Sequence, residues 1–208
     1  MTAGHPRLPS VLRKQPLQER SRLAVEHVLD TASEIVVEQG TEAFSSSPTI
    51  LLERSGISRG SFYAFFESPE RVLDELARRS MIDSYRQITE HFASRPGSAW
   101  TEIIDIMIDH YRYQYRIPLI RELWVGQHLN ASIRSLDQIW CAELADLVLE
   151  QFRMHPPHFD RLSHLQCAIG IEIIERLAQF AFRNSPQGDE TILAESHDVL
   201  TGYFAPFE

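Results

Sequence analysis

The sequence predicts an all-α protein of about nine helices, and three observations support that fold class. Apolar residues recur with a helical period along most of the chain, clusters of Pro and Gly interrupt that period at intervals, and no segment alternates as a β-strand would. The 208 residues provide one large or two small domains. We therefore expect an N-terminal three-helix domain and a larger helical domain after it.

The N-terminal end is predicted to be an arm followed by a helix. Residues 1–19 contain three prolines and no periodicity, which is typical of a flexible arm. From Arg20 the period becomes helical, and Gly40 is expected to end this helix. Its predicted inward residues are Val25, Val28, Leu29, Ala32, Ile35 and Val36.

Two short helices are expected next. Ser47 and Pro48 suit the cap and first position of a helix, and Gly56 should stop it after about two turns. Ser58 is a second N-cap, for a helix that we expect to continue through Phe66. A helix, a glycine turn and another short helix make a helix-turn-helix.

The rest of the chain is predicted to be helical as well. Ser68 and Pro69 repeat the pairing of cap and proline, and they should open a long helix with Val72, Leu73 and Leu76 inside. Further helices are expected near 98–116, 118–128, 132–153, 157–183 and 189–204.

The third helix carries a cluster of aromatic residues that should have two roles. On a helical wheel Phe65 and Phe66 each lie within about 60° of Phe62, so these three rings should anchor this helix on the first one. Tyr63 then lies at the exposed surface with its hydroxyl free. Gly60 keeps the outward face flat, so that the backbone can approach a groove closely.

The stretch "SSPTILLERSGISRGSFYAFFESPERVLDELARR" resembles the DNA-binding module of TetR/AcrR-type transcriptional repressors over about residues 20–79. The resemblance implies a homodimer, a variable ligand-binding domain and release from operator DNA when a small molecule binds. It divides the chain into a basic arm (1–19), a helix-turn-helix domain (20–67) and a ligand-binding and dimerisation domain (68–208).

The resemblance also implies which residues meet double-stranded DNA. Hydroxyls and helix starts suit phosphates, and an arginine suits guanine O6 and N7. The start of the second helix is expected at phosphate, the recognition helix at base edges, and its tyrosine at backbone phosphate. The positions assigned to DNA on this basis are Ser47, Thr49, Ser58, Arg59, Gly60, Ser61 and Tyr63.

The charge distribution places the expected anion at one end of the chain. The net charge is −9, but residues 1–22 carry five basic residues and one acidic residue, a local charge of +4, and residues 67–208 carry −9. Pro69 stands where the family usually has a phosphate-binding lysine. The basic residues expected to compensate, at backbone or minor groove, are Lys14, Arg20 and Arg22.

The C-terminal domain has stripes rich in aromatic residues, which are ordinary core or the walls of a pocket for an apolar or aromatic ligand. The family resemblance favours a pocket. Its expected lining is Met107, Tyr111, Tyr115, Trp124, Gln127, His128 and Trp140. No ligand identity, operator sequence or cofactor follows from the sequence.

The last two helices are apolar on more than one side, so more than one side must be covered. The small residues Ala168, Gly170, Ala178 and Ala181 permit close helix contact. A two-fold interface between copies is the preferred interpretation, because a helix-turn-helix usually reads paired half-sites.

The sequence gives weaker support for a metal site or a redox site. "HPPHFDRLSH" brings three histidines near one another, but capping or solvated histidines are favoured over a metal site. Cys141 and Cys167 lie in apolar patterns and are expected to be buried free thiols. No membrane span or signal peptide is recognisable, which favours the cytoplasm.

Two other function classes compete with a DNA-binding regulator. A di-metal bundle enzyme needs paired Glu-x-x-His motifs, and the sequence has none, so we expect no enzyme. A helical module that binds only proteins is the remaining alternative, and DNA selection would separate it from a regulator.

Overall fold

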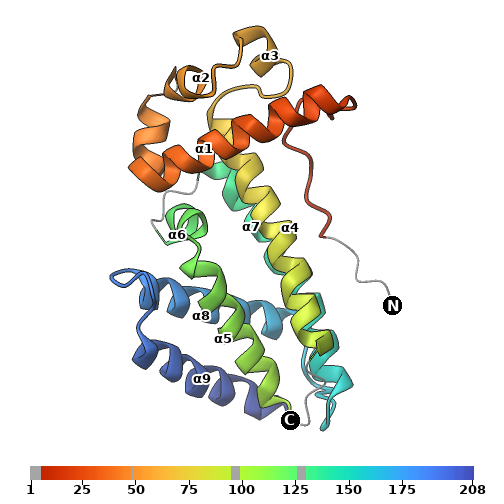
Figure 1. Cartoon of the computed structure of the whole chain (residues 1–208). Coiled ribbons are helices and arrows are strands. Elements are labelled where there is room, and N and C mark those ends of the chain that lie inside the picture. The colour runs from red at the N-terminus through yellow and green to blue at the C-terminus, as the bar shows by residue number, and fades with distance from the viewer. Residues whose placement is uncertain (1–5, 48, 95–98, 126–129) are drawn as a thin grey trace.

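The computed structural model describes residues 6–47, 49–94, 99–125 and 130–208, and all regular secondary structure in these segments is helical (Figure 1). Pro48, expected at a helix start, lies outside the described residues. The helices are α1 (Glu19–Ser46), α2 (Thr49–Ser55), α3 (Arg59–Tyr63), α4 (Glu70–Ser94), α5 (Thr101–Arg116), α6 (Pro118–Trp124), α7 (Ala131–Met154), α8 (His164–Phe182) and α9 (Glu190–Phe204), with a 3-10 turn at Ala205–Phe207.

The first helix confirms the predicted face and end. All six predicted inward residues of α1 are buried. At Gly40 the backbone leaves the helical region, with φ of 84° and ψ of 163°, before one more helical turn leads to Ser46. A positive φ favours glycine, so the residue that was expected to end the helix is the residue that breaks it.

The N-terminal module, α1 to α3, lies at one end of the molecule, and the pair α8 and α9 lies at the other (Figure 1). The long helices α4 and α7 run between these ends and pack on each other. α4 follows directly after the turn that ends the module, so one helix joins α3 to the C-terminal body.

Two predicted boundaries are wrong. α3 ends at Tyr63, because Ala64 and Phe65 form a turn that brings Phe66 into the core. α8 begins at 164 and not at 157: His158 and Phe159 have positive φ, and Phe159 is buried against Phe152 with 4.8 Å between ring centroids. A capping box, which the sequence argument overlooked, then starts α8.

The arm does not project freely into solvent. Residues 6–18 form no helix, as expected, but Leu8 and Val11 are buried in the core. The Arg13 backbone N–H donates to the Phe65 carbonyl at 2.9 Å. The arm therefore packs beside the turn after α3.

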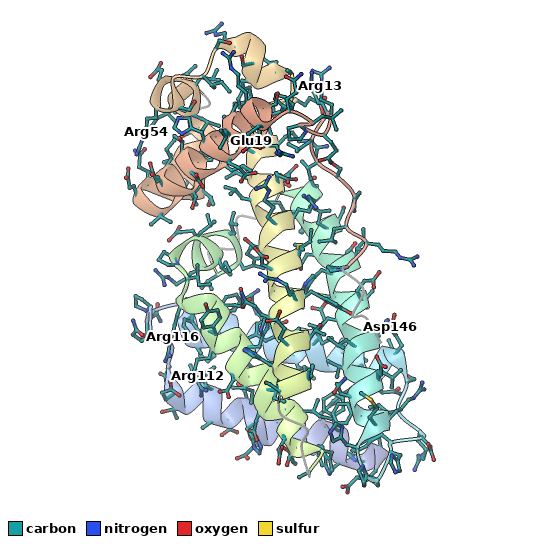
Figure 2. The ribbon with its side chains drawn as sticks, turned by 45° about the vertical axis from the view of Figure 1, so that its right-hand side comes forward. Arg13, Glu19, Arg54, Arg112, Arg116 and Asp146 are labelled. Carbon is teal, nitrogen blue, oxygen red and sulfur yellow. The ribbon has the colours of Figure 1, made fainter. Side chains whose placement is uncertain are left out.

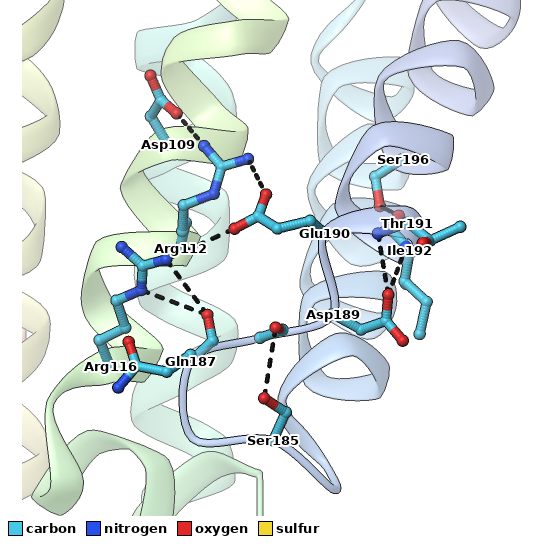
Figure 3. Close-up of polar contacts among 11 residues, drawn as sticks. Asp109, Arg112, Arg116, Ser185, Gln187, Asp189, Glu190, Thr191, Ile192 and Ser196 are labelled. Atoms are coloured by element: carbon cyan, nitrogen blue, oxygen red, sulfur yellow. Dashed lines mark hydrogen bonds and ion pairs between the residues drawn. The ribbon is translucent and has the colours of Figure 1, made fainter.

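Polar contacts fix α5 against the start of α9 (Figure 3). Arg112 pairs with Asp109 on its own helix and with Glu190 at 3.1 Å. Arg116 donates to the Gln187 carbonyl at 3.3 Å from two of its nitrogens. The wall of the body that α5 forms is thus tied to the loop between the last two helices.

Candidate DNA-binding surface and ligand cavity

The short helix α3 is capped at its start and anchored along one side. The Ser58 hydroxyl accepts from the Ser61 backbone N–H at 3.2 Å and donates to the Ser61 hydroxyl at 2.9 Å. Phe62 is fully buried and stacks on Phe66, with 5.4 Å between centroids. A five-residue helix is unstable alone, so this anchor holds its outward side in place.

The outward side of α3 carries the side chains predicted to meet DNA. Tyr63 is 42% exposed, and its ring meets Phe62 edge to face. A side chain added at Gly60 would contact no atom within 4 Å, so the space in front of α3 is open. The predicted contact residues that are exposed are Ser47, Thr49, Ser58, Arg59, Gly60, Ser61, Tyr63, Lys14, Arg20 and Arg22.

The basic arm brings two cations to the end of α3. The Arg13 guanidinium donates to the Tyr63 carbonyl at 3.4 Å, and Arg13 lies beside the turn after α3 (Figure 2). Lys14 Nζ sits 5.1 Å from the centre of the Phe65 ring. Arg22 is less available than expected, because its Nε donates to Glu19 at 3.2 Å.

A network of ion pairs centred on a buried glutamate of α4 reaches the module through Arg79. Glu75 has no exposed surface and accepts from Arg78 at 2.7 Å and from Arg79 at 3.0 Å. Arg79 also pairs with Glu26 of α1 at 2.5 Å. Nearby, the buried Asp74 accepts from Asn130 at the start of α7, at 2.8 Å. The first turns of α4 are thus tied both to the module and to the body.

A cavity lies between α4, α5, α6, α7 and α8. The volume that the centre of a water molecule can occupy inside it is about 40 Å³. On the same measure a single water needs ~10–15 Å³, so the cavity has room for more than one water. Of the predicted wall residues, Tyr111, Tyr115, Trp124 and Trp140 line it. Met107 is buried in the core and is not part of the lining. Gln127 and His128 lie outside the described residues.

Polar groups of this cavity were missed by sequence reasoning. Its lining includes His110, whose Nε2 lies 2.7 Å from the Ser84 hydroxyl, and two carboxyl groups, Asp137 and Glu175. Burial lowers the pKa of His110 to about 3, so the ring is neutral. Glu175 offered a signal, since it interrupts the apolar run "AIGIEIIERLAQFAF" of α8.

Burial, with the neighbouring carboxylates, sets the ionisation of these acidic groups. Burial first and the charge of Asp137 second raise the pKa of Glu175 to about 8. Burial also raises the pKa of Asp137, although the hydrogen bond from the Trp124 indole opposes this. The pKa of the nearby Cys141 thiol is raised as well, chiefly by burial. The surroundings of the cavity therefore favour the protonated form of these carboxyl groups over the ionised form.

In the segment "HPPHFDRLSH" each histidine lies near a different backbone carbonyl oxygen. His155 and His158 lie within 3.0 Å of backbone carbonyl oxygens, and His164 lies 3.1 Å from the Ala142 carbonyl. Cys141 and Cys167 are buried free thiols, as predicted.

The outer face of α8 and α9 is apolar. Leu165, Ile169, Phe180 and Val199 are all exposed there, and the first two line a shallow groove with Val199. Inside, the expected close approach of helices is confirmed at Gly170, where an added Cβ would lie 2.4 Å from the Phe204 ring. None of the described helices combines the length and the apolar character needed to cross a bilayer.

Two solved structures with a similar architecture are described as TetR-family regulators. A TetR-family transcriptional regulator from Streptomyces coelicolor superposes with a TM-score of 0.67 over 90% of this chain and 98% of its own, at 24% identity. A structure from Syntrophomonas wolfei, described as a candidate TetR-family regulator, gives 0.62 over 88% and 95%, at 11% identity. Neither family models nor curated proteins gave a match. The chain thus has the TetR-type fold that its motifs predicted, and neither of these structures is described as an enzyme.

Proposed function

We propose that this protein is a sequence-specific DNA-binding transcriptional regulator that works as a repressor and leaves its operator when a small molecule binds. The observation that carries the proposal is the outward side of α3. Arg59, Ser61 and Tyr63 are exposed on a helix whose opposite side is fixed by the buried Phe62. Exposed donors on a rigidly held helix are what readout of a DNA groove requires.

The proposed roles divide between bases and backbone. Arg59 enters the major groove and donates to guanine, while Tyr63 and the hydroxyls of Ser47 and Thr49 donate to phosphates. Lys14, held over Phe65, supplies a cation beside α3. The charge that the family places at Pro69 then comes from the arm, because Pro69 is itself buried.

A homodimer formed through α8 and α9 follows from the apolar outer face. Glu172 and Arg176 border that face one helical turn apart, so two antiparallel copies of α8 place each glutamate near the other copy's arginine. Two recognition helices are then presented to half-sites ~34–36 Å apart. Ile169→Arg should give monomers in sedimentation; a dimer that survives this change must use another face.

The proposed effector binds in the cavity of the body and acts through α4. Ser80, Met81 and Ser84 of α4 line the cavity, and the same helix begins directly after the turn that ends the module. An effector that prefers a different position of α4 changes the spacing of the two α3 helices. The coupling between effector and operator is then reciprocal, typically ~1–3 kcal/mol.

DNA selection with the purified protein tests the proposal, followed by gel shifts with variants. Arg59→Ala should relax base preference and cost ~1–3 kcal/mol on the selected site. Tyr63→Phe should weaken all sequences about equally, by ~1 kcal/mol. Arg161→Ala, an exposed arginine ahead of α8, is the control and should change neither. If no sequence is enriched, a module that binds only proteins becomes the better description.

A further inference from the structure

Two carboxyl groups of the cavity face each other without a basic side chain between them. The nearest oxygens of Asp137 and Glu175 lie within 4.8 Å of one another. Each has one neutral donor: the Trp124 indole at 3.2 Å for Asp137, and the Gln179 amide at 2.9 Å for Glu175. Among the described residues, no ion pair within 4.0 Å reaches either carboxylate.

Such a pair is costly to keep ionised, because a buried charge requires a partner of opposite sign. Burial and then the charge of Asp137 raise the pKa of Glu175 to about 8, so this carboxyl group keeps its proton at neutral pH and avoids part of that cost. Two buried acidic residues of α4 are treated differently: Glu75 is matched by two arginines, and Asp74 by Arg71 at 2.7 Å. The cavity therefore has two acceptors whose countercharge is missing.

Aromatic rings surround these acceptors. Tyr111 and Tyr115 of α5, Trp124 of α6 and Trp140 of α7 all line the same cavity. The Tyr111 hydroxyl is buried and has no hydrogen-bond partner, and it is close enough to both carboxyl groups for their charge to raise its pKa. Rings whose faces attract cations, together with two carboxylates and an unpartnered hydroxyl, favour a ligand that carries a positive charge on an apolar body.

We propose that the cavity binds an organic ammonium ion, with its charged nitrogen between Asp137 and Glu175 and its apolar part against Tyr115, Trp124 and Trp140. This inference deepens the proposed function by naming the chemical class of the effector, and it rests on that function only for the step from binding to DNA release. The unoccupied volume suits a small cation.

A metal ion is the competing occupant, since Cys141 offers a sulfur within 4.8 Å of both carboxylates. The ammonium ion is favoured for two reasons. Cys141 is not part of the cavity lining, and its burial beside carboxylates disfavours the thiolate that a metal needs. The four aromatic rings, by contrast, contribute nothing to metal binding and much to the binding of an ammonium ion.

Proton release distinguishes an ammonium ion from a neutral ligand. A cation favours the ionised carboxylates, so binding near neutral pH should expel protons, mainly from Glu175. The other ionisable groups that face the pair are His110, Tyr111 and Tyr115 of α5, Cys141 of α7 and Glu172 of α8. His110 is neutral near pH 7, and the raised pKa values of Tyr111, Tyr115 and Cys141 keep those groups protonated there.

Calorimetry on the full chain tests the proposal with matched pairs of probes: benzylammonium against benzyl alcohol, butylammonium against butanol, and tetramethylammonium against tert-butanol. At least one ammonium ion should bind about tenfold or more tightly than its neutral counterpart, the range expected for a desolvated cation on aromatic rings. The observed heat should also depend on the ionisation enthalpy of the buffer, because protons are released.

Variants locate the charge. Glu175→Gln and Asp137→Asn should each remove most of that preference while circular dichroism confirms folding, and Cys141→Ala should keep it. If no ammonium ion binds more tightly than its neutral counterpart in the unmodified chain, the proposal is wrong. It is equally wrong if Zn²⁺ binds instead and Cys141→Ala abolishes that binding.

Gel shifts on the selected operator distinguish failure of the cation site from failure of the proposed function. If the unmodified chain shows no preference for an ammonium ion but still binds the operator, the cation site alone is rejected. Ammonium binding that leaves operator affinity unchanged supports the cation site and rejects the ligand-driven release.

Discussion

The outward side of α3 and the cavity of the body are built in opposite ways. Arg59, Ser61 and Tyr63 are exposed, and the structure only has to hold their helix still. Glu175 is buried, Asp137 is half-buried and both lack a countercharge, so their surroundings change their chemistry. An exposed surface can meet its partner without rearrangement, whereas a buried acidic pair leaves a countercharge to be supplied by what binds there.

The largest expected effect concerns Glu175. Its pKa is raised from 4.5 to about 8, so the folded protein holds a proton that the unfolded chain releases between these values. Below pH 4.5 the Glu175 carboxyl is protonated in both states and does not lower the free energy of unfolding. That free energy falls as the pH rises from 4.5 towards 8, where only the unfolded chain has released the proton. Glu175→Gln should abolish this slope and raise the free energy of unfolding at pH 9 by on the order of 4 kcal/mol.

Urea titrations from pH 4 to pH 9 measure this effect. Glu150→Gln, an exposed glutamate of α7, is the matched control and should leave the slope unchanged. Parallel pH profiles for the parent and Glu175→Gln would mean that the carboxyl is solvated in solution, and the contrast with α3 would disappear.

The second effect concerns the first turns of α4, which connect the N-terminal module to the body that holds the cavity. Glu75→Ala removes the buried carboxylate that holds Arg78 and Arg79, and breaking such a pair costs ~3–5 kcal/mol, here at the lower end because both arginines reach solvent. Asp83→Ala breaks an exposed pair with Arg86 on the same helix and should cost less than ~1 kcal/mol. Equal losses of thermal stability in the two variants would contradict the role of Glu75 as the buried centre of the network that holds Arg79 against Glu26 of α1.

These two sites also mark the limit of what the sequence predicts. The break in α1 and the start of α3 could be predicted, because caps and glycines act over a few positions: Gly40 and Ser58 behave as expected. The aromatic walls followed from helical stripes. The acidic pair did not, because Asp137 and Glu175 are 38 positions apart and meet only when α7 packs on α8.

The packing of the arm and the start of α8 were missed for a similar reason. Leu8 and Val11 looked like isolated apolar residues among prolines, and their burial depends on the core that distant parts of the chain form together. Phe159 likewise interrupts an apparently helical run by entering the core beside Phe152. Long-range burial decided both, and local periodicity carries no information about it.

The third prediction concerns close packing in the body. A methyl group at Gly170 would lie 2.4 Å from the Phe204 ring, so Gly170→Ala should force α8 and α9 apart and cost ~1–3 kcal/mol. Gly202→Ala on α9 meets no atom within 4 Å and should be neutral or stabilising by up to ~1 kcal/mol. Thermal denaturation of both variants measures the difference. If the two alanines behave alike, the packing between the helices is looser than described.

The smallest expected effect concerns the arm, and its packing dictates the variant. Deleting residues 1–19 would expose the surface that Leu8 and Val11 cover, so loss of folding could be mistaken for loss of DNA contacts. Lys14→Gln removes the charge that lies over the Phe65 ring and keeps a shorter, polar side chain at that position. If Lys14 contacts a phosphate, the slope of log affinity against log salt should flatten by ~0.9, with a loss of no more than ~1 kcal/mol at low salt.

Arg7→Gln is the matched control, since Arg7 is an exposed cation of the same arm, seven positions before Lys14 in the chain. Gel shifts at several salt concentrations compare the two variants. A flattened slope for Lys14→Gln alone places the arm's charge at the end of α3. Equal flattening in both variants would instead mean that the arm acts through its summed charge, and the packing of Lys14 on Phe65 would then serve stability and not DNA binding.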